Sequence, residues 1–199
     1  MTAKRPVRTR RDRWADWAVI GVLIVALLLG WVVKALAEGR RDTYTDTQNE
    51  LTLRYPRGWL LKADEDLAFQ AVDPGSGDFK TTYQVRIWPI DATAEMTPTL
   101  TLVLNNNSLA RAQGGLAYRL FDTVEGAEKD GQPTMEMTYV YVEPGSDLFM
   151  QQMPVVVQGL DIAVGHGDEA YVFSLLASQA GFEGAEAAFR RFVKSAEIW

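Results

Sequence analysis

Two kinds of hydrophobic pattern divide this chain. Near the N-terminus the apolar residues form one nearly continuous run, from Trp17 to Val33. From residue 50 onward the apolar residues come in short segments, and most of these alternate with polar residues. Alternation of this kind is typical of strands that bury one face, whereas a long unbroken run is typical of a membrane-spanning helix. The pattern therefore predicts an apolar helix followed by a folded domain.

The apolar run is long enough for one transmembrane helix. About 20 helical residues cross a hydrocarbon layer of about 30 Å, and the run with its flanks covers 14–37. Trp14, Trp17 and Trp31 lie toward its ends, where indole rings favour the membrane interface, and Lys34 can extend its ammonium toward the headgroups. We therefore expect a transmembrane helix at 14–37, with these four residues as its interfacial anchors.

Charge is distributed unevenly between the two parts. Residues 1–41 hold nine basic and three acidic residues, whereas residues 42–199 hold 11 basic and 23 acidic residues. Basic residues beside a membrane span remain in the cytoplasm, so 1–13 is expected to be a basic cytoplasmic tail and 38–199 to lie outside. The acidic body would repel phosphate groups, which excludes nucleic acid as the expected partner.

A cleaved signal peptide is the alternative to an anchor. Ala35-Leu36-Ala37 is a small-x-small triplet of the kind that precedes a cleavage site. Against cleavage, the apolar region of a signal peptide usually spans about 7–15 residues, and the run here is longer. A mature protein that begins at Glu38 would distinguish cleavage after Ala37 from anchoring.

The body is predicted to alternate between strands and helices. Strands are predicted at 51–55, 67–72, 83–90, 118–125, 134–142, 155–164 and 170–178. For 98–113 the sequence suits either element, and we favour a helix because Thr97-Pro98 resembles a helix start. The last element, 182–196, repeats apolar residues at helical spacing. We therefore expect an α+β domain with a mostly antiparallel sheet over 50–199, joined to the anchor by a polar tether at 38–49.

Residues that could support catalysis are sparse. The chain has no cysteine, and its one histidine, His166, lies between two glycines at a predicted hairpin tip, so an exposed turn residue is favoured over a general base. Neither a serine elbow nor a phosphate-binding loop is present. We therefore predict no catalytic, cofactor or metal site, and we do not expect an enzyme.

Two acidic segments offer oxygen ligands for a cation. The segment 73–78 has two carboxylates and flexible carbonyls, but it lacks the ligand spacing of an EF-hand. Asp64, Glu65 and Asp66 could form a weak cation site or an electrostatic docking patch. We favour solvated loops for both segments.

The connection at 143–154 is unusually apolar for a loop. Leu148, Phe149, Met150 and Met153 stand among turn residues there. Adaptable apolar side chains of this kind form either a protein-contact surface or a flap that folds back on the core. Both interpretations remain open, and the four residues are candidates for partner contact.

Three features follow one another along the body. An opening strand leads into the turn Tyr55-Pro56-Arg57-Gly58-Trp59, a middle helix follows the third strand, and a closing hairpin leads into an amphipathic helix that ends in Val193-Lys194-Ser195. In this order the features resemble the PsbP/Mog1-like superfamily. The resemblance covers about residues 43–199 and implies an α/β/α sandwich with a mostly antiparallel sheet. Members of that superfamily typically bind protein partners or support larger assemblies, and they share no catalytic residues.

These observations together predict a bacterial, single-pass protein of the cytoplasmic membrane. Its N-terminus would lie in the cytoplasm and its C-terminal domain outside, as a non-enzymatic accessory or interaction subunit of a larger membrane protein complex. Its expected partners are the lipid bilayer and other subunits of that complex, without a cofactor. The alternative is an extracytoplasmic module that binds a small ligand, a lipid or a cation. A hydrolase is disfavoured because the sequence shows no catalytic set.

Overall fold

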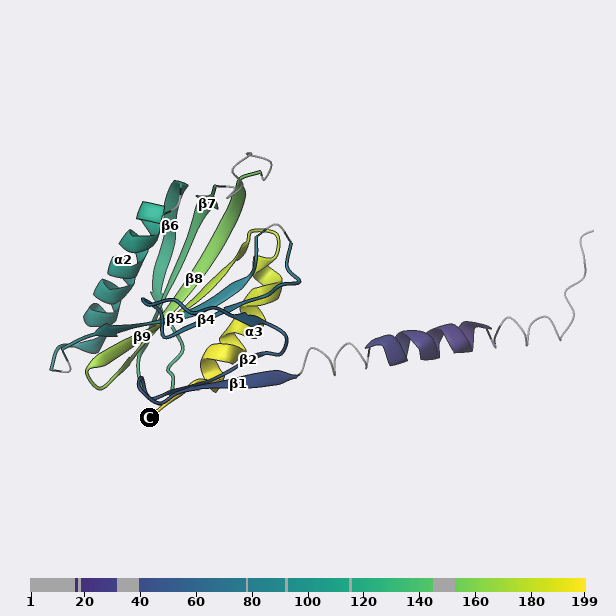
Figure 1. The fold of residues 1–199 in the computed structure, drawn as a ribbon, viewed down its shortest axis with the longest axis horizontal. Helices are drawn as coiled ribbons and strands as arrows, with labels where there is room; N and C mark the ends of the chain where they lie inside the picture. Colours follow the sequence, from purple (N-terminus) through teal and green to yellow (C-terminus); the bar gives the residue numbers. More distant parts are fainter. Residues whose placement is uncertain are drawn as a thin grey trace, which may run out of the picture. The chain divides into compact units, whose positions relative to one another are not determined.

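The structure is a computed structural model, and it describes residues 17, 19–31, 40–77, 79–91, 93–114, 116–144 and 153–199 (Figure 1). The chain divides into two compact units between Arg41 and Asp42. In the first unit, residues 19–31 form a helix with exposed apolar side chains. Within the described ranges, no helix is both long enough and apolar enough to cross a membrane. Trp14, Lys34 and the predicted tail lie outside the described residues.

The domain that follows contains ten strands and two long helices in its described part, with the labels of Figure 1. The strands are β1 (Arg41–Asp46), β2 (Leu51–Pro56), β3 (Leu60–Leu61), β4 (Phe69–Val72), β5 (Thr82–Pro89), β6 (Leu116–Glu125), β7 (Thr134–Glu143), β8 (Val155–His166), β9 (Glu169–Ser178) and β10 (Glu197–Ile198). The helices are α2 (Met96–Gly114) and α3 (Phe182–Ser195).

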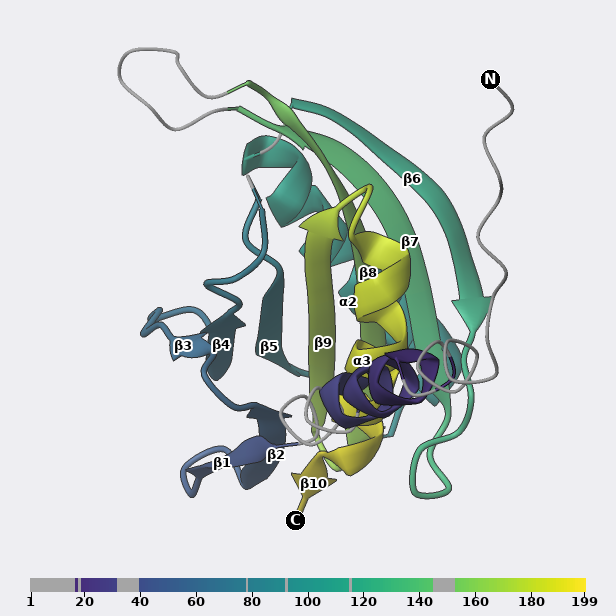
Figure 2. The ribbon, with the colours of Figure 1, turned by 90° about the vertical axis from the view of Figure 1, so that its right-hand side faces the viewer.

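Seven strands form one sheet in the order β3-β4-β5-β9-β8-β7-β6, and each of its pairings is antiparallel. Figure 2 shows this sheet as a curved surface with β6 at one edge. A smaller sheet has the order β1-β2-β10, and in it the C-terminal strand pairs with β2 through Ile198 and Leu51. The prediction of a mostly antiparallel α+β domain is confirmed.

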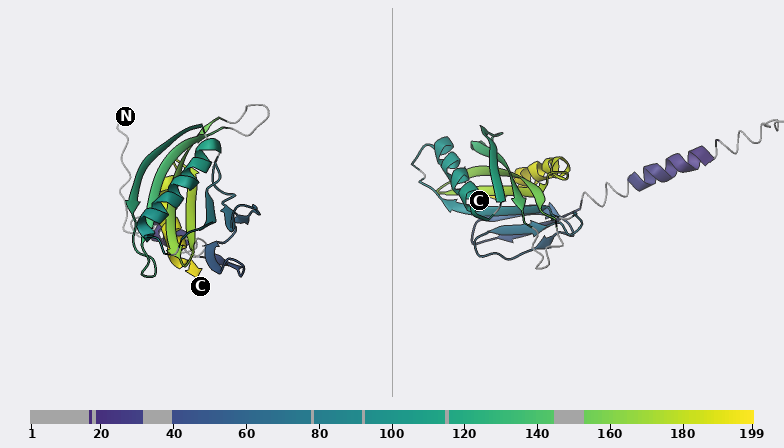
Figure 3. Two further views of the ribbon diagram at one scale, coloured as in Figure 1. Left: turned by 90° about the vertical axis from the view of Figure 1, so that its left-hand side faces the viewer. Right: turned by 90° about the horizontal axis from the view of Figure 1, so that it is seen from above.

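The two helices cover opposite faces of the large sheet. Along β8, Leu160 and Ile162 belong to the core under α3, whereas Val157 and Ala163 belong to the core under α2. Because side chains alternate between the faces of a strand, the two cores lie on opposite sides. Figure 2 accordingly shows α3 in front of the sheet, and the left view of Figure 3 shows α2 in front of it.

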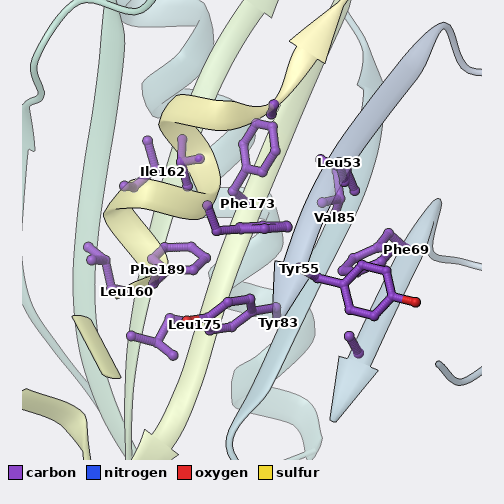
Figure 4. Close-up of a cluster of buried hydrophobic side chains, with 14 of the residues drawn as sticks. Leu53, Tyr55, Phe69, Tyr83, Val85, Leu160, Ile162, Phe173, Leu175 and Phe189 are labelled. Carbon is purple, nitrogen blue, oxygen red and sulfur yellow. The ribbon is translucent and has the colours of Figure 1, made fainter. Parts of the chain in front are cut away.

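The core under α3 is dominated by aromatic rings. Phe189 of α3 packs against Tyr83 of β5 with ring centroids 5.2 Å apart, and Phe192 lies 6.1 Å from Phe173 of β9. Figure 4 shows this cluster, in which Leu160 and Ile162 of β8 complete the surface under the helix. Full burial of each such side chain contributes roughly 1.5–3 kcal/mol, so α3 is held mainly by this apolar face.

The structure corrects the predicted tether and the start of one helix, and it adds a strand that was not predicted. Residues 41–46 form β1 rather than part of a tether, because Tyr44 packs on Phe69 at 5.2 Å and its hydroxyl donates to the Ala68 carbonyl at 3.1 Å. Strand β3 was not predicted, because a two-residue edge strand has too few positions for a pattern. The helix α2 begins at Met96, so Thr97 lies in its first turn rather than capping it.

Candidate functional site

A layer of polar side chains lies between α2 and the large sheet, around the fully buried Asp161 of β8. The Tyr139 hydroxyl of β7 donates to Oδ1 of Asp161 at 3.0 Å. The Asn107 amide of α2 donates to Oδ2 at 2.6 Å, and Nε of Arg111 lies 3.8 Å from the same oxygen. Burying a carboxylate costs free energy unless it is paired with a positive charge and hydrogen-bonded. Here β7 and α2 supply the hydrogen bonds, and α2 also supplies the positive charge.

Strand register brings Tyr139 to Asp161. Tyr139 lies directly opposite Gly159, and a Cβ atom on Gly159 would come within 2.3 Å of the tyrosine ring. The ring therefore occupies the space that a side chain at 159 would take. Since residues two apart share one face of a strand, the hydroxyl reaches Asp161 farther along β8. Glycine at 159 is thus required for the close approach that builds the layer.

Two arginines extend the layer from Asp161 toward β5. Nη2 of Arg111 donates to Oε1 of Gln84 at 3.0 Å, and its guanidinium carbon lies 5.8 Å from the centroid of the Tyr139 ring. Nη1 of Arg86 donates to Oδ1 of Asn107 at 3.3 Å. The Asn107 amide therefore accepts from Arg86 and donates to Asp161, which links β5, α2 and β8 in one chain of hydrogen bonds.

Charge is not balanced within the buried layer. Asp161 faces Arg111, but Arg86 has no carboxylate partner in the described part of the chain. Nε of Arg111 is buried and has no hydrogen-bond partner among the same residues. The layer therefore holds two guanidiniums and one carboxylate, and only Arg111 lies beside that carboxylate.

A cleft of about 330 Å³ opens beside the arginines. It is lined by two arginines, two acidic residues, a tyrosine, a glutamine and two apolar residues: Asp64, Leu67, Gln84, Arg86, Ala110, Arg111, Tyr141 and Glu143. Tyr141 is buried and Arg111 is only 16% exposed, whereas Asp64 is exposed. The cleft thus offers both positive and negative groups to a ligand.

Burial keeps the phenols of this region protonated. It raises the pKa of Tyr139 well above its ordinary value, although the nearby Arg111 opposes the shift. Burial likewise raises the pKa of Tyr141 to about 12. For Arg111, burial lowers the pKa, but the combined electrostatic effects of the surrounding tyrosines and of Asp161 outweigh it, and the net pKa is above its usual value. At neutral pH the phenols therefore donate hydrogen bonds and Arg111 stays charged.

A second candidate surface is strand β6, the outer edge of the large sheet. Within the described sheet it pairs only with β7, so its outer backbone groups have no strand partner. Four of its apolar side chains are exposed: Leu116, Leu120, Phe121 and Val124. Its register with β7 shifts twice, and Ala117 in the first shift adopts a φ of 52°. An edge with exposed apolar side chains is a template for pairing with another chain.

The residues predicted for partner contact fall largely outside the structure. Leu148, Phe149 and Met150 lie outside the described residues, and Met153 is 78% exposed just before β8. Whether the connection at 143–154 forms a contact surface or a core flap therefore stays a prediction.

Two of the predicted anchor residues, Trp17 and Trp31, lie within the described residues, and both are exposed.

The other candidate sites have the local structure of turns. His166 is exposed at the end of β8, where it pairs with Glu169 across the hairpin. In the segment 73–78, the Lys80 ammonium donates to the carbonyls of Pro74 and Ser76 at 3.2 and 2.5 Å, so the chain itself supplies a cation there. No cluster of three or more potential metal ligands occurs among the residues that the structure describes.

The polar layer was not predicted from the sequence. One signal was present, because Asp161 is the single charged residue in the apolar strand 155–164. A carboxylate at such a position is rarely buried unless it is paired. A second signal was the i,i+4 spacing of Asn107 and Arg111, which places both on one face of α2. Neither signal indicates which strand supplies the partner.

Comparison with known proteins identifies the fold. No family model and no curated protein matches the sequence. The solution structure of cyanobacterial PsbP (CyanoP) from Synechocystis sp. PCC 6803 is similar, with a TM-score of 0.61 and 17% identity over 80% of this chain and 92% of that chain. The Saccharomyces cerevisiae Ran-binding protein Mog1p has a TM-score of 0.49 and 9% sequence identity, over 80% of this chain and 95% of that chain. Mycobacterium tuberculosis LpqN, involved in cell envelope biogenesis, has a TM-score of 0.48 and 12% identity, over 80% of this chain and 90% of that chain. The likeness to cyanobacterial PsbP shows that the domain has a PsbP-like fold, as the resemblance of its opening turn and of its closing hairpin and helix implied.

Proposed function

We propose that this chain is a non-enzymatic accessory subunit of a larger membrane protein complex, and that it binds a protein partner along β6. The single observation that carries the proposal is the exposed edge strand with its row of exposed apolar side chains. The N-terminal segment 14–37 would hold the chain in the cytoplasmic membrane, with the domain on the outer side.

The chemistry of the N-terminal helix supports the membrane part of the proposal. Residues 19–31 are apolar on every side of the helix and are exposed in the first unit. A helix that is hydrophobic all round needs apolar surroundings, and a bilayer supplies them. Trp14, Trp17, Trp31 and Lys34 would lie at the two interfaces, and the basic residues of 1–13 favour a cytoplasmic N-terminus.

The occupant that best fits β6 is an extended segment of a partner protein. Such a segment would pair with the outer backbone groups and cover side chains on both faces of the strand. Leu120 lies on the face shared with Tyr139, whereas Val124 lies on the face shared with Glu136. Arg119 and Asp122 add one charge of each sign, which would favour a partner strand with the complementary order of charges.

The buried layer supports a non-enzymatic role. The Asp161 carboxylate is fully buried, and both of its oxygens accept hydrogen bonds from neighbouring side chains. A general base must be able to reach the proton that it removes. Asp161 is therefore suited to holding α2 on the sheet rather than to proton transfer.

The test is affinity purification of the full-length chain from native membranes, followed by identification of co-purifying proteins. The variants Leu120→Lys and Phe121→Lys are expected to lose the partner, because a charge would be placed in the paired interface. Leu109→Lys on α2 is the matched control, since Leu109 is 63% exposed against 54% for Phe121. The control is expected to retain the partner.

Two results would contradict the proposal. One is a wild-type chain that purifies from membranes alone as a monomer. The other is a β6 variant that retains every partner of the wild type. A homodimer that these variants dissociate, with no other protein present, would show that β6 pairs with a second copy instead of a complex subunit.

A further inference from the structure

Arg86 and Arg111 form a positively charged wall of the cleft, and neighbouring side chains fix the positions of both guanidiniums. Arg86 is fixed by its hydrogen bond to Asn107 and lies 6.0 Å from the Trp88 ring. Arg111 is fixed by Gln84 on one side and by the charge of Asp161 on the other. A guanidinium has five N–H donors, and each of these two arginines donates one hydrogen bond to a side chain of the described residues. Both guanidiniums therefore keep N–H donors that form no hydrogen bond to a described side chain, although their positions are already fixed.

Arg86 has no negatively charged partner in this wall. The carboxylate of Asp161 lies beside Arg111, and among the described residues no acidic group forms an ion pair with Arg86. Arg86 is partly buried, and a partly buried guanidinium without a counter-charge is unfavourable. A carboxylate would supply that charge and match the planar geometry of the guanidinium.

The other charged groups of the cleft limit which carboxylate would fit. Asp64 and Glu143 also line it, and they would repel a ligand with two or more negative charges. They would attract an ammonium group at the other end of the ligand. The volume of about 330 Å³ lies near the lower end for small-molecule sites, which span roughly 300–1,000 Å³.

We propose that this cleft binds a small amino carboxylate, with the carboxylate at Arg86 and Arg111 and the ammonium toward Asp64 and Glu143. The neutral phenol of Tyr141 lines the same cleft and is available as a further hydrogen-bond donor to the carboxylate. The cleft involves no residue of β6, so this binding stands independently of the proposed protein partner.

The test uses the full-length chain in detergent and measures binding by calorimetry and by the shift in melting temperature. The probes are L-alanine and L-leucine, the matching amines ethylamine and isoamylamine, the matching acids propionate and 4-methylvalerate, and inorganic phosphate. Both amino acids are expected to raise the melting temperature in a concentration-dependent way. The amines, the acids and phosphate are expected to bind about tenfold more weakly or not at all.

Two variants connect the binding to the cleft. Arg86→Gln removes the unmatched charge, and it is expected to weaken amino acid binding by about tenfold or more while the unliganded protein stays folded. Glu143→Gln removes one carboxylate near the ammonium, and it is expected to weaken amino acid binding but strengthen propionate binding. The opposite signs distinguish a ligand contact from a general loss of structure, which would weaken both. Far-UV circular dichroism monitors folding in each variant.

Three outcomes would overturn the proposal. The first is that neither amino acid binds the wild-type chain. The second is that phosphate or a simple acid binds more tightly than the amino acids, which would exclude the zwitterion. The third is that Arg86→Gln binds the amino acids as tightly as the wild type does. Loss of a protein partner in β6 variants would leave amino acid binding unchanged, so the two proposals fail separately.

Discussion

The hydroxyl of Tyr139 donates a 3.0 Å hydrogen bond to Oδ1 of Asp161, and both residues are fully buried. Tyr139 comes from β7 and Asp161 from β8, so this bond ties two neighbouring strands through their side chains as well as their backbones. The Asn107 amide adds a bond from α2 to the same carboxylate. The position of α2 on the sheet therefore depends on a polar contact as well as on apolar packing.

Removing the Tyr139 hydroxyl is expected to destabilise the domain. In Tyr139→Phe one oxygen of a buried carboxylate loses its donor, which costs about 1–3 kcal/mol of unfolding free energy. Tyr141→Phe is the control, because the hydroxyl of Tyr141 does not bond to Asp161, and its effect is expected to be below about 0.5 kcal/mol. Urea denaturation of both variants measures the difference. Equal losses would show that the bond to Asp161 is not the source of the effect.

A side chain at residue 159 is expected to disturb the same contact from the other side. In Gly159→Ala the new Cβ atom would lie 2.3 Å from the Tyr139 ring, so the ring must move. Overpacking of this kind costs typically about 1–3 kcal/mol. Gly184→Ala is the matched control, because a Cβ atom at residue 184 would meet no described atom within 4 Å and alanine favours the α3 helix. Thermal unfolding should show a lower midpoint for the first variant only, and a similar decrease in both would contradict the argument.

Alkaline pH is expected to destabilise the domain through its buried phenols. Burial raises the pKa of Tyr141 from 10.0 to about 12 in the folded state. A group with a raised pKa favours folding below its unfolded pKa, and that contribution is lost as pH rises through the folded value. The unfolding free energy should therefore fall between about pH 10 and pH 12. Denaturation at several pH values measures the slope, and Tyr141→Phe should reduce it; an unchanged slope would exclude Tyr141 as a source.

The ion pair between β7 and α3 is expected to contribute more than the exposed pair near the C-terminus. Arg190 donates to both carboxylate oxygens of Glu136 at 2.7 and 2.8 Å, and Glu136 is 13% exposed. Glu136→Gln should cost about 1 kcal/mol, after allowance for the 44% exposure of Arg190, and the cost should shrink in high salt. The exposed pair of Arg54 and Glu197 is the control, and Glu197→Gln should have almost no effect. A salt-independent loss would contradict an ionic origin.

Elements with a strong local pattern were predictable from the sequence. In α3, Phe189 and Phe192 recur at helical spacing, and Glu186 pairs with Arg190 at 2.9 Å as the i,i+4 spacing predicts. The hairpin of β8 and β9 follows from two apolar segments that flank a glycine turn. The strand β1 was missed because its pairing depends on β2, and Tyr44 contacts Phe69 at a distance along the chain that no local pattern reports.

The sequence by itself determined the apolar N-terminal run, the contrast between a basic tail and an acidic body, and the order of both long helices and of seven of the ten described strands. These properties are local, because they depend on side-chain period and on charge within short segments. Only the tertiary structure decided that Asp161 meets Tyr139 and Asn107, which are 22 and 54 residues away along the chain. It also decided that β6 is an edge, since an edge is defined by which strands pair. Contacts of this kind depend on strand order and register, and the same local pattern is compatible with many of them.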